Sequence, residues 1–132
     1  MTHLDFSVNV DHVATLRNAP AGTVPCPVEA ARITAPAGAD GVTMHLREDR
    51  RHIRDREVER VRAEIAAPLN FEMAATEEMV AFAERIRPPY CCLVPEKRAE
   101  LTTEGGLDML RPGPFLAEAI GRLRTAGVRV SI

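Results

Sequence analysis

Three short apolar segments of this chain carry polar side chains at matching positions. In each segment a small polar residue is followed, two positions later, by a titratable one. The pairs are Asn9 with Asp11, Thr43 with His45, and Asn70 with Glu72. Carboxylates and imidazoles are common proton donors and acceptors in enzymes. If the three pairs meet in space, the sequence predicts an acid–base site.

The alternation of each segment places its polar pair on one face of a strand. Residues two apart in a strand share a face. The apolar residues fill the opposite face, in the sets Val8 and Val10; Val42, Met44 and Leu46; Leu69, Phe71 and Met73. Ligands of (β/α) barrels and open α/β sheets bind at the carboxyl ends of parallel strands. A polar network that merely closes a barrel interior is the alternative, but three strands in phase favour a site.

Charged residues follow the second of these segments at once, in "GVTMHLREDRRHI" (41–53). His45 is a candidate acid or base, and Glu72 beside it makes proton abstraction near a carbonyl plausible. Arg47, next on the same face, could bind a phosphate or carboxylate with two hydrogen bonds. The remaining charges are nearly balanced in sign. They predict a solvated loop and helix start rather than a nucleic-acid surface.

The order of the elements predicts an α/β fold with a parallel sheet. Apolar runs typical of strands cover residues 6–10, 41–46, 68–74, 90–94 and 128–132. Helical patterns lie between them. The first helix opens at Pro27 and ends before Pro36. Asp55 caps the second and Thr76 the third. Pro114 opens the fourth, which Gly127 closes. Strands that alternate with helices favour a sheet covered by helices.

The composition indicates one soluble-type domain with one core: 132 residues, 45% hydrophobic and 27% charged. The net charge of −2 implies no general attraction to nucleic acid or lipid. There is no apolar run of about 18 residues and no signal-peptide pattern at the N-terminus, so we expect a cytoplasmic protein without membrane contact. The three cysteines have neither disulfide-framework nor zinc spacing, and we expect buried thiols.

A long polar stretch, "EKRAELTTEGGLD" (96–108), follows the fourth strand. Loops of this length in a compact domain are often functional lids, and otherwise are variable connections. The residues themselves leave both interpretations open. We find no Walker motif, no dinucleotide-binding fingerprint and no metal-ligand spacing.

The sequence resembles the pyridoxine 5′-phosphate synthase family of vitamin B6 biosynthesis. Four stretches carry the resemblance: "VNVDHVATLRNA" (8–19), "AGADGVTMHLREDRRHI" (37–53), "NFEMAATEEM" (70–79) and "CCLVPEKRAELTTEGGLD" (91–108). The resemblance implies a (β/α)8 TIM barrel without a redox or metal cofactor. It also implies condensation of 3-amino-2-oxopropyl phosphate with 1-deoxy-D-xylulose 5-phosphate, giving pyridoxine 5′-phosphate, phosphate and water. A homo-oligomer is expected at full length.

The same resemblance assigns roles to individual residues. His45 and Glu72 match the family's acid–base residues, and Asn9 matches a ligand of the aminoketone phosphate. The expected ligands of the deoxyxylulose phosphate are Asp11, His12, Arg47, His52 and Thr102. The stretch around Thr102 resembles the family's closing lid. The alternation of the strands does not point to His12, His52 or Thr102, which by themselves resemble ordinary loop residues.

The sequence departs from the family pattern in two places. After "RNA" the family continues with Arg-Gly, whose Arg contacts the aminoketone substrate, whereas Pro20 and Ala21 stand here. This contact is therefore missing unless another residue, such as Arg17, replaces it. The second departure is length, since a (β/α)8 barrel needs about 250 residues. We expect 1–132 to be the N-terminal portion of one barrel domain: four βα units and a fifth strand, without the family's later histidine and glycine-rich phosphate loop.

Three functional hypotheses follow. The first is the N-terminal half of the synthase, inactive as a separate chain. The second is a non-catalytic half-barrel that binds a sugar phosphate or assembles with another half. The third is an unrelated barrel enzyme that acts on phosphosugars. The coding sequence downstream of Ile132 distinguishes the first two best, because an in-frame continuation supports the first and a stop codon the second.

Overall fold

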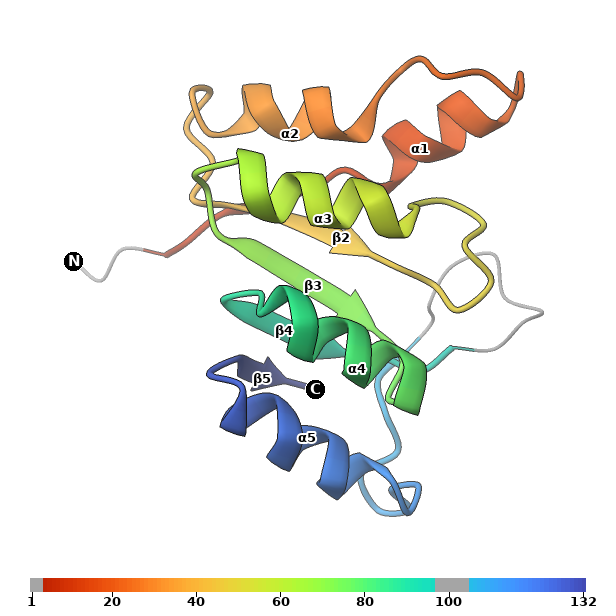
Figure 1. Cartoon of the computed structure of the whole chain (residues 1–132), viewed down its shortest axis with the longest axis vertical. Helices are drawn as coiled ribbons and strands as arrows, with labels where there is room; N and C mark the ends of the chain where they lie inside the picture. Colours follow the sequence, from red (N-terminus) through yellow and green to blue (C-terminus); the bar gives the residue numbers. More distant parts are fainter. Residues whose placement is uncertain (1–3, 97–104) are drawn as a thin grey trace.

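A computed structural model describes residues 4–96 and 105–132 of the chain. Strands and helices alternate through most of its length (Figure 1). The order is β1 (Ser7–Asn9), α1 (Asp11–Asn18), α2 (Pro27–Thr34), β2 (Gly41–His45), α3 (Asp55–Glu64), β3 (Leu69–Met73), α4 (Glu77–Ile86), β4 (Tyr90–Leu93), α5 (Leu116–Thr125) and β5 (Arg129–Ser131). The α/β class is therefore confirmed.

The five strands form one sheet in the order β1-β2-β3-β4-β5, and every neighbouring pair is parallel. Figure 1 shows α2, α3, α4 and α5 along one side of this sheet. Sequential parallel strands with helices on one side are the arrangement of a TIM-barrel wall. The five strands and their crossover helices match the expected part of a barrel.

The apolar residues of the strands lie on the face that the helices cover. Met44 and Phe71 are completely buried there, together with Val58 of α3 and Met79 of α4. The rings of Phe71 and Phe82 lie 5.7 Å apart between β3 and α4. This contiguous core confirms the predicted alternation and leaves the polar residues of the strands on the opposite face.

Three of the predicted helix ends are confirmed. Pro27 is the first residue of α2, where its missing N–H is not needed. The hydroxyl of Thr76 accepts a 3.5 Å hydrogen bond from the backbone N–H of Met79 at the start of α4. Gly127 has φ +84° just after α5, a backbone conformation that glycine adopts without a steric penalty.

Two helix starts differ from the prediction. Asp55 is the first residue of α3 rather than its cap, and Arg54 occupies the capping position. The carboxylate of Glu57 accepts a 2.8 Å hydrogen bond from the N–H of Arg54, which satisfies this helix end without Asp55. Helix α5 begins at Leu116, two residues after Pro114.

Helix α1 was not predicted. Its buried residues are Asp11, Ala14 and Arg17, so its inward face carries two charges and lacks the apolar stripe of an ordinary surface helix. Hydrogen bonds of these charged side chains to other elements compensate for their burial. A pattern search based on apolar periodicity therefore cannot detect it.

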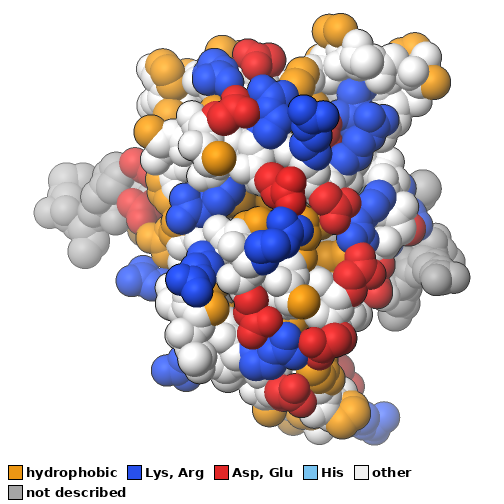
Figure 2. All heavy atoms as spheres, viewed as in Figure 1, with side chains coloured by type: hydrophobic (Ala, Val, Ile, Leu, Met, Phe, Trp, Pro, Cys, Tyr) orange, Lys and Arg blue, Asp and Glu red, His pale blue; other side chains and the backbone are white. Residues whose placement is uncertain are grey.

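The helix-covered side is densely charged with both signs. Figure 2 shows acidic and basic side chains interspersed over this side. Some of them pair between helices, as Arg122 of α5 does with Glu84 of α4 at 2.7 Å. Cys91 is buried, as expected, whereas Cys26 and Cys92 are only half-buried. No helix in the described ranges is long and apolar enough to cross a bilayer.

Candidate active site

Asp11, His45 and Glu72 meet at the carboxyl ends of the first three strands. One potential donor or acceptor atom of each lies within 4.8 Å of those of the other two. His45 and Glu72 face each other directly in the β2–β3 register. Asp11 and His45 are each only 9% exposed. The convergence predicted from the alternation of the strands is therefore present.

Asn9 and the backbone of His45 hold Asp11 in place. The side-chain oxygen of Asn9 accepts from the N–H of Asp11, and its amide nitrogen donates to Oδ2 of Asp11, both at 2.8 Å. The other carboxylate oxygen, Oδ1, accepts from the N–H of His45 at 2.9 Å. Asp11 is the first residue of α1, yet these bonds keep its carboxylate beside β2.

Burial changes the proton affinity of both carboxyl groups. It raises the pKa of Glu72 above its ordinary value, against the attraction of His45, and the nearby charge of Asp11 raises this pKa further. Burial also raises the pKa of Asp11, although the hydrogen bonds from His45 and Asn9 oppose the change. Such groups hold protons at a higher pH than exposed carboxylates do, which suits a site that exchanges protons with a substrate.

A cationic group adjoins these carboxyl groups. Burial lowers the pKa of the His52 imidazole; the charge of Asp11 opposes this change, and Arg47, Arg51 and His12 reinforce it. Arg47 is only 4% exposed, and its Nε lies 3.6 Å from Asp49. The guanidinium groups of Arg47 and Arg51 near His52 are groups that can bind a phosphate by charge-assisted hydrogen bonds.

Three side chains of α1 hold the backbone and ring of His52, and sequence reasoning missed these contacts. Thr15 Oγ1 lies 3.3 Å from Nδ1 of His52. Arg17 donates to the carbonyl of His52 at 3.0 Å, and Asn18 donates to the carbonyls of Arg51 and His52.

Arg17 is buried and its side chain is held by residues of other segments. It is 2% exposed, forms an ion pair with Glu57 of α3, and is turned toward the backbone of His52. Pro20 is exposed in the turn after α1. These contacts hold the Arg17 side chain inside the protein, whereas Pro20 lies at its surface.

Glu96, three residues beyond the end of β4, also reaches the cluster. Its Oε1 lies 2.8 Å from Nε2 of His45, and its Oε2 accepts from the N–H of Glu48 at 3.1 Å. Burial tends to raise the pKa of Glu96, but these hydrogen bonds and the charges of His45 and Arg47 together outweigh it and hold the pKa below its usual value. Its place just after the apolar run 90–94 was the one sequence signal for Glu96, and that signal does not indicate His45 as its partner.

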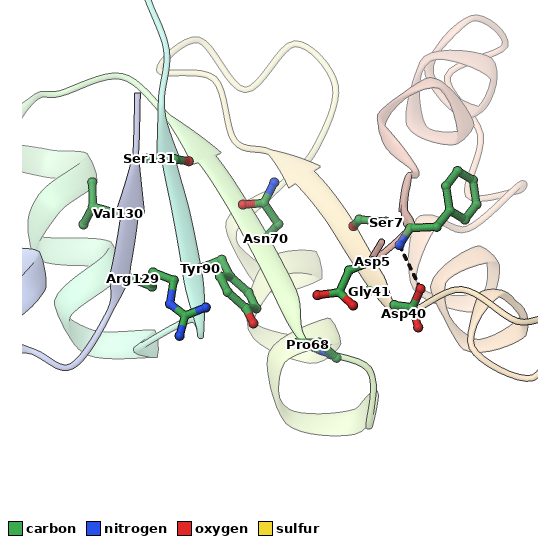
Figure 3. Close-up of a pocket in the computed structure, with 11 residues that line it drawn as sticks. Asp5, Ser7, Asp40, Gly41, Pro68, Asn70, Tyr90, Arg129, Val130 and Ser131 are labelled. Carbon is green, nitrogen blue, oxygen red and sulfur yellow. Dashed lines mark hydrogen bonds between the residues drawn. The ribbon is translucent and has the colours of Figure 1, made fainter. Parts of the chain in front are cut away.

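A separate hollow of about 310 Å³ opens at the amino ends of the strands (Figure 3). Asn70, Tyr90 and Arg129 line it, with the Arg129 guanidinium 5.4 Å from the Tyr90 ring. Asn70 precedes Glu72 by two residues on β3. The hollow therefore lies toward the amino ends of the strands, whereas the acid–base residues lie at their carboxyl ends. It contains none of the acid–base residues.

Comparison with known proteins identifies the family. The model of the family described as "Pyridoxal phosphate biosynthesis protein PdxJ" matches residues 6–132. The chain belongs to the PdxJ family. Among curated relatives, the pyridoxine 5′-phosphate synthase of Xanthobacter autotrophicus is 64% identical over 96% of this chain and 49% of its own length.

Two other relatives with the same printed name agree with this assignment. The protein of a Bradyrhizobium species is 62% identical over 98% of this chain and half of its own length. That of Gluconobacter oxydans is 63% identical over 96% of this chain and 54% of its own length. The chain thus spans about half the length of the curated relatives it matches.

The structure collects most of the residues that the PdxJ resemblance singles out. At the carboxyl ends of the first three strands and in the segments that follow lie Asn9, Asp11, His12, His45, Arg47, His52 and Glu72. Thr102 lies outside the described residues. The Asp11, His45 and Glu72 atoms are close enough to surround a small cation, but their buried carboxyl groups also fit proton transfer, and we assign no metal here.

Proposed function

We propose that this chain supplies the acid–base half of a pyridoxine 5′-phosphate synthase site. The reaction joins 3-amino-2-oxopropyl phosphate to 1-deoxy-D-xylulose 5-phosphate and yields pyridoxine 5′-phosphate, phosphate and water. The observation that carries the proposal is the meeting of Asp11, His45 and Glu72 within 4.8 Å. The names of the relatives support pyridoxine 5′-phosphate as the product, and the two substrates are those that the family resemblance implies.

The chemistry of the condensation needs groups of this kind. Joining an amine to a ketone expels water, and closing the ring by a carbon–carbon bond requires a proton to leave a carbon next to a carbonyl. Both steps need a group that takes a proton and returns it. Glu72, whose pKa burial raises, and His45 opposite it in the strand register act as this acid–base pair.

The polar residues around the pair bind the two phosphorylated substrates in this proposal. Asn9 contacts the aminoketone phosphate. Asp11, His12, Arg47 and His52 contact the deoxyxylulose phosphate, and the guanidinium groups of Arg47 and Arg51 near His52 support this assignment. Thr102 is proposed as a further contact on the strength of the family motif alone.

The 132-residue polypeptide by itself is proposed to be inactive. One face of its sheet is covered by helices and the other carries the polar cluster, while β1 and β5 form the two edges of the sheet. A barrel encloses such a cluster with further strands. A half-barrel that binds a sugar phosphate without turnover is the alternative, and the uncovered polar face favours it as the second candidate.

A chimera tests the proposal. Residues 6–132 replace the matching segment of the Xanthobacter autotrophicus relative, and pyridoxine 5′-phosphate formation is measured. We expect an active chimera, a loss of about 10²–10⁴ in turnover for Glu72→Gln, and no loss for Glu118→Gln, an exposed glutamate on α5. A folded chimera that makes no product, or near-normal turnover of the Glu72→Gln variant, contradicts the proposal. Binding of the deoxyxylulose phosphate by the separate chain, together with a folded but inactive chimera, supports the second candidate.

A further inference from the structure

The contact between Glu96 and His45 connects two segments that are far apart in sequence. Glu96 follows β4, whereas His45 ends β2, and β3 lies between these strands. The Glu96 side chain is 5% exposed and that of His45 is 11% exposed. A carboxylate that crosses over a neighbouring strand into this buried position requires specific compensation, because burial of a charge without a partner is costly.

Both oxygens of Glu96 find such compensation. Oε1 lies 2.8 Å from Nε2 of His45, and Oε2 accepts from the N–H of Glu48 at 3.1 Å. An ionised carboxylate has no proton to donate. The short contact to Nε2 is therefore a hydrogen bond only when Nε2 carries the proton.

The second ring nitrogen of His45, Nδ1, can accept a proton from a substrate. Within the described residues, the hydrogen bond recorded for the His45 ring is the one at Nε2, while its backbone N–H donates to Asp11. Which nitrogen of a histidine carries the proton is decided by the partner of the other nitrogen. A neutral His45 with its proton on Nε2 has its lone pair on Nδ1.

We infer that Glu96 is a positioning residue that keeps the proton of His45 on Nε2, so that Nδ1 takes and returns the proton of the reaction. The inference rests on the proposed function for the identity of that reaction. When Nδ1 takes a proton from the substrate, the ring becomes an imidazolium cation beside the Glu96 carboxylate. The same proton leaves from Nδ1 when the ring acts as an acid, so Glu96 neither gains nor loses one.

The first test is the tautomer of His45 in the 132-residue chain, observed by long-range ¹H–¹⁵N NMR with ¹⁵N-labelled histidine. The His45 signals are assigned by their loss in His45→Gln. We expect the neutral ring to be protonated on Nε2 in the wild-type chain and to become a mixture of tautomers in Glu96→Gln, because an amide can also donate to Nε2. Glu48→Gln is the matched control, since Glu48 contributes only its backbone N–H and carbonyl to the recorded contacts. A wild-type ring protonated on Nδ1, or an unchanged tautomer in Glu96→Gln, overturns the inference.

The second test is kinetic and uses the chimera. We expect Glu96→Gln to lower kcat about 10- to 100-fold, by analogy with the loss seen when the hydrogen-bond partner of a metal-binding histidine is removed, with KM changed less than about twofold and Glu48→Gln near wild type. A purely structural anchor would lower stability and leave the tautomer and kcat in place, which would overturn the inference. An inactive wild-type chimera contradicts the proposed function, whereas the NMR result still decides the role of Glu96. The spectrum is also recorded on the chimera, so poor solubility of the short chain does not prevent the test.

Discussion

The interaction of Arg17 with Glu57 gives the sharpest prediction about stability. The Arg17 side chain is 3% exposed and that of Glu57 is 13% exposed, so the ion pair is almost fully removed from water. Removing one partner of a buried pair leaves an uncompensated charge and typically costs about 3–5 kcal/mol. Arg17→Met removes the guanidinium but keeps a side chain of similar length. Glu57 would retain its bond from the N–H of Arg54, which places the expected loss near the lower end, about 3 kcal/mol.

The assay is urea unfolding of the 132-residue chain, followed by circular dichroism at one protein concentration, because association makes stability depend on concentration. Arg32→Met is the control. The Arg32 side chain is 47% exposed and pairs with Glu64 on the surface, so its replacement should cost no more than about 1 kcal/mol. Comparable losses for the two variants, or a loss below about 1 kcal/mol for Arg17→Met, would refute the assignment of a buried, stabilising pair.

A double-mutant cycle separates the pair from the other bonds of Arg17. If the uncompensated carboxylate causes most of the loss, Glu57→Gln should partly restore the Arg17→Met variant. The two replacements together should then cost less than the sum of the single costs by about 0.5–3 kcal/mol. Strictly additive losses would mean that the bond from Arg17 to the His52 carbonyl, rather than the pair, carries the effect.

Three further predictions concern the missing arginine, pH and association. Pro20→Arg in the chimera should lower KM for the aminoketone phosphate alone, by roughly 10- to 100-fold for one charge-assisted contact; an equal change for both substrates would argue against a specific contact. Because burial raises the pKa of Glu72 above 4.5 in the folded protein, the folded state binds the proton more tightly than the unfolded chain, so the unfolding free energy should fall as pH rises from 4.5 through the folded-state pKa. Glu72→Gln should flatten this slope in urea titrations at several pH values, and an unchanged slope would exclude Glu72 as its source. The separate chain should self-associate or aggregate through the β1 and β5 edges, and a stable monomer in light scattering during size-exclusion chromatography would contradict this.

The sequence predicts well which side chains of a strand share a face, because this alternation depends only on neighbouring residues. A period of two fixes which side chains share a face, so Thr43 and His45 could be assigned to the polar face from their own segment. The parallel sheet then brings equivalent positions of neighbouring strands together. The register of His45 opposite Glu72 follows from both segments having the same phase.

Contacts between distant segments were beyond this reasoning. Arg17 meets Glu57 across 40 positions of the chain, and His45 meets Glu96 across 51. Helix α1 was hidden for a related reason, since its inward face is built from charged residues whose partners lie in other elements. Such residues look like ordinary surface charges until the fold supplies their partners.

The distribution of titratable groups over the five strands explains why Glu96 is needed. In the row of the sheet that contains His45 and Glu72, β4 contributes Cys92 and β5 contributes Ser131. The fourth strand therefore brings no carboxylate of its own to the cluster. Glu96 supplies one from beyond the end of the strand, where the backbone N–H of Glu48 can anchor its second oxygen. The acid–base cluster is thus built from His45 and Glu72 inside β2 and β3 and from Asp11 at the start of α1, while the group that orients His45 comes from the segment after the fourth strand.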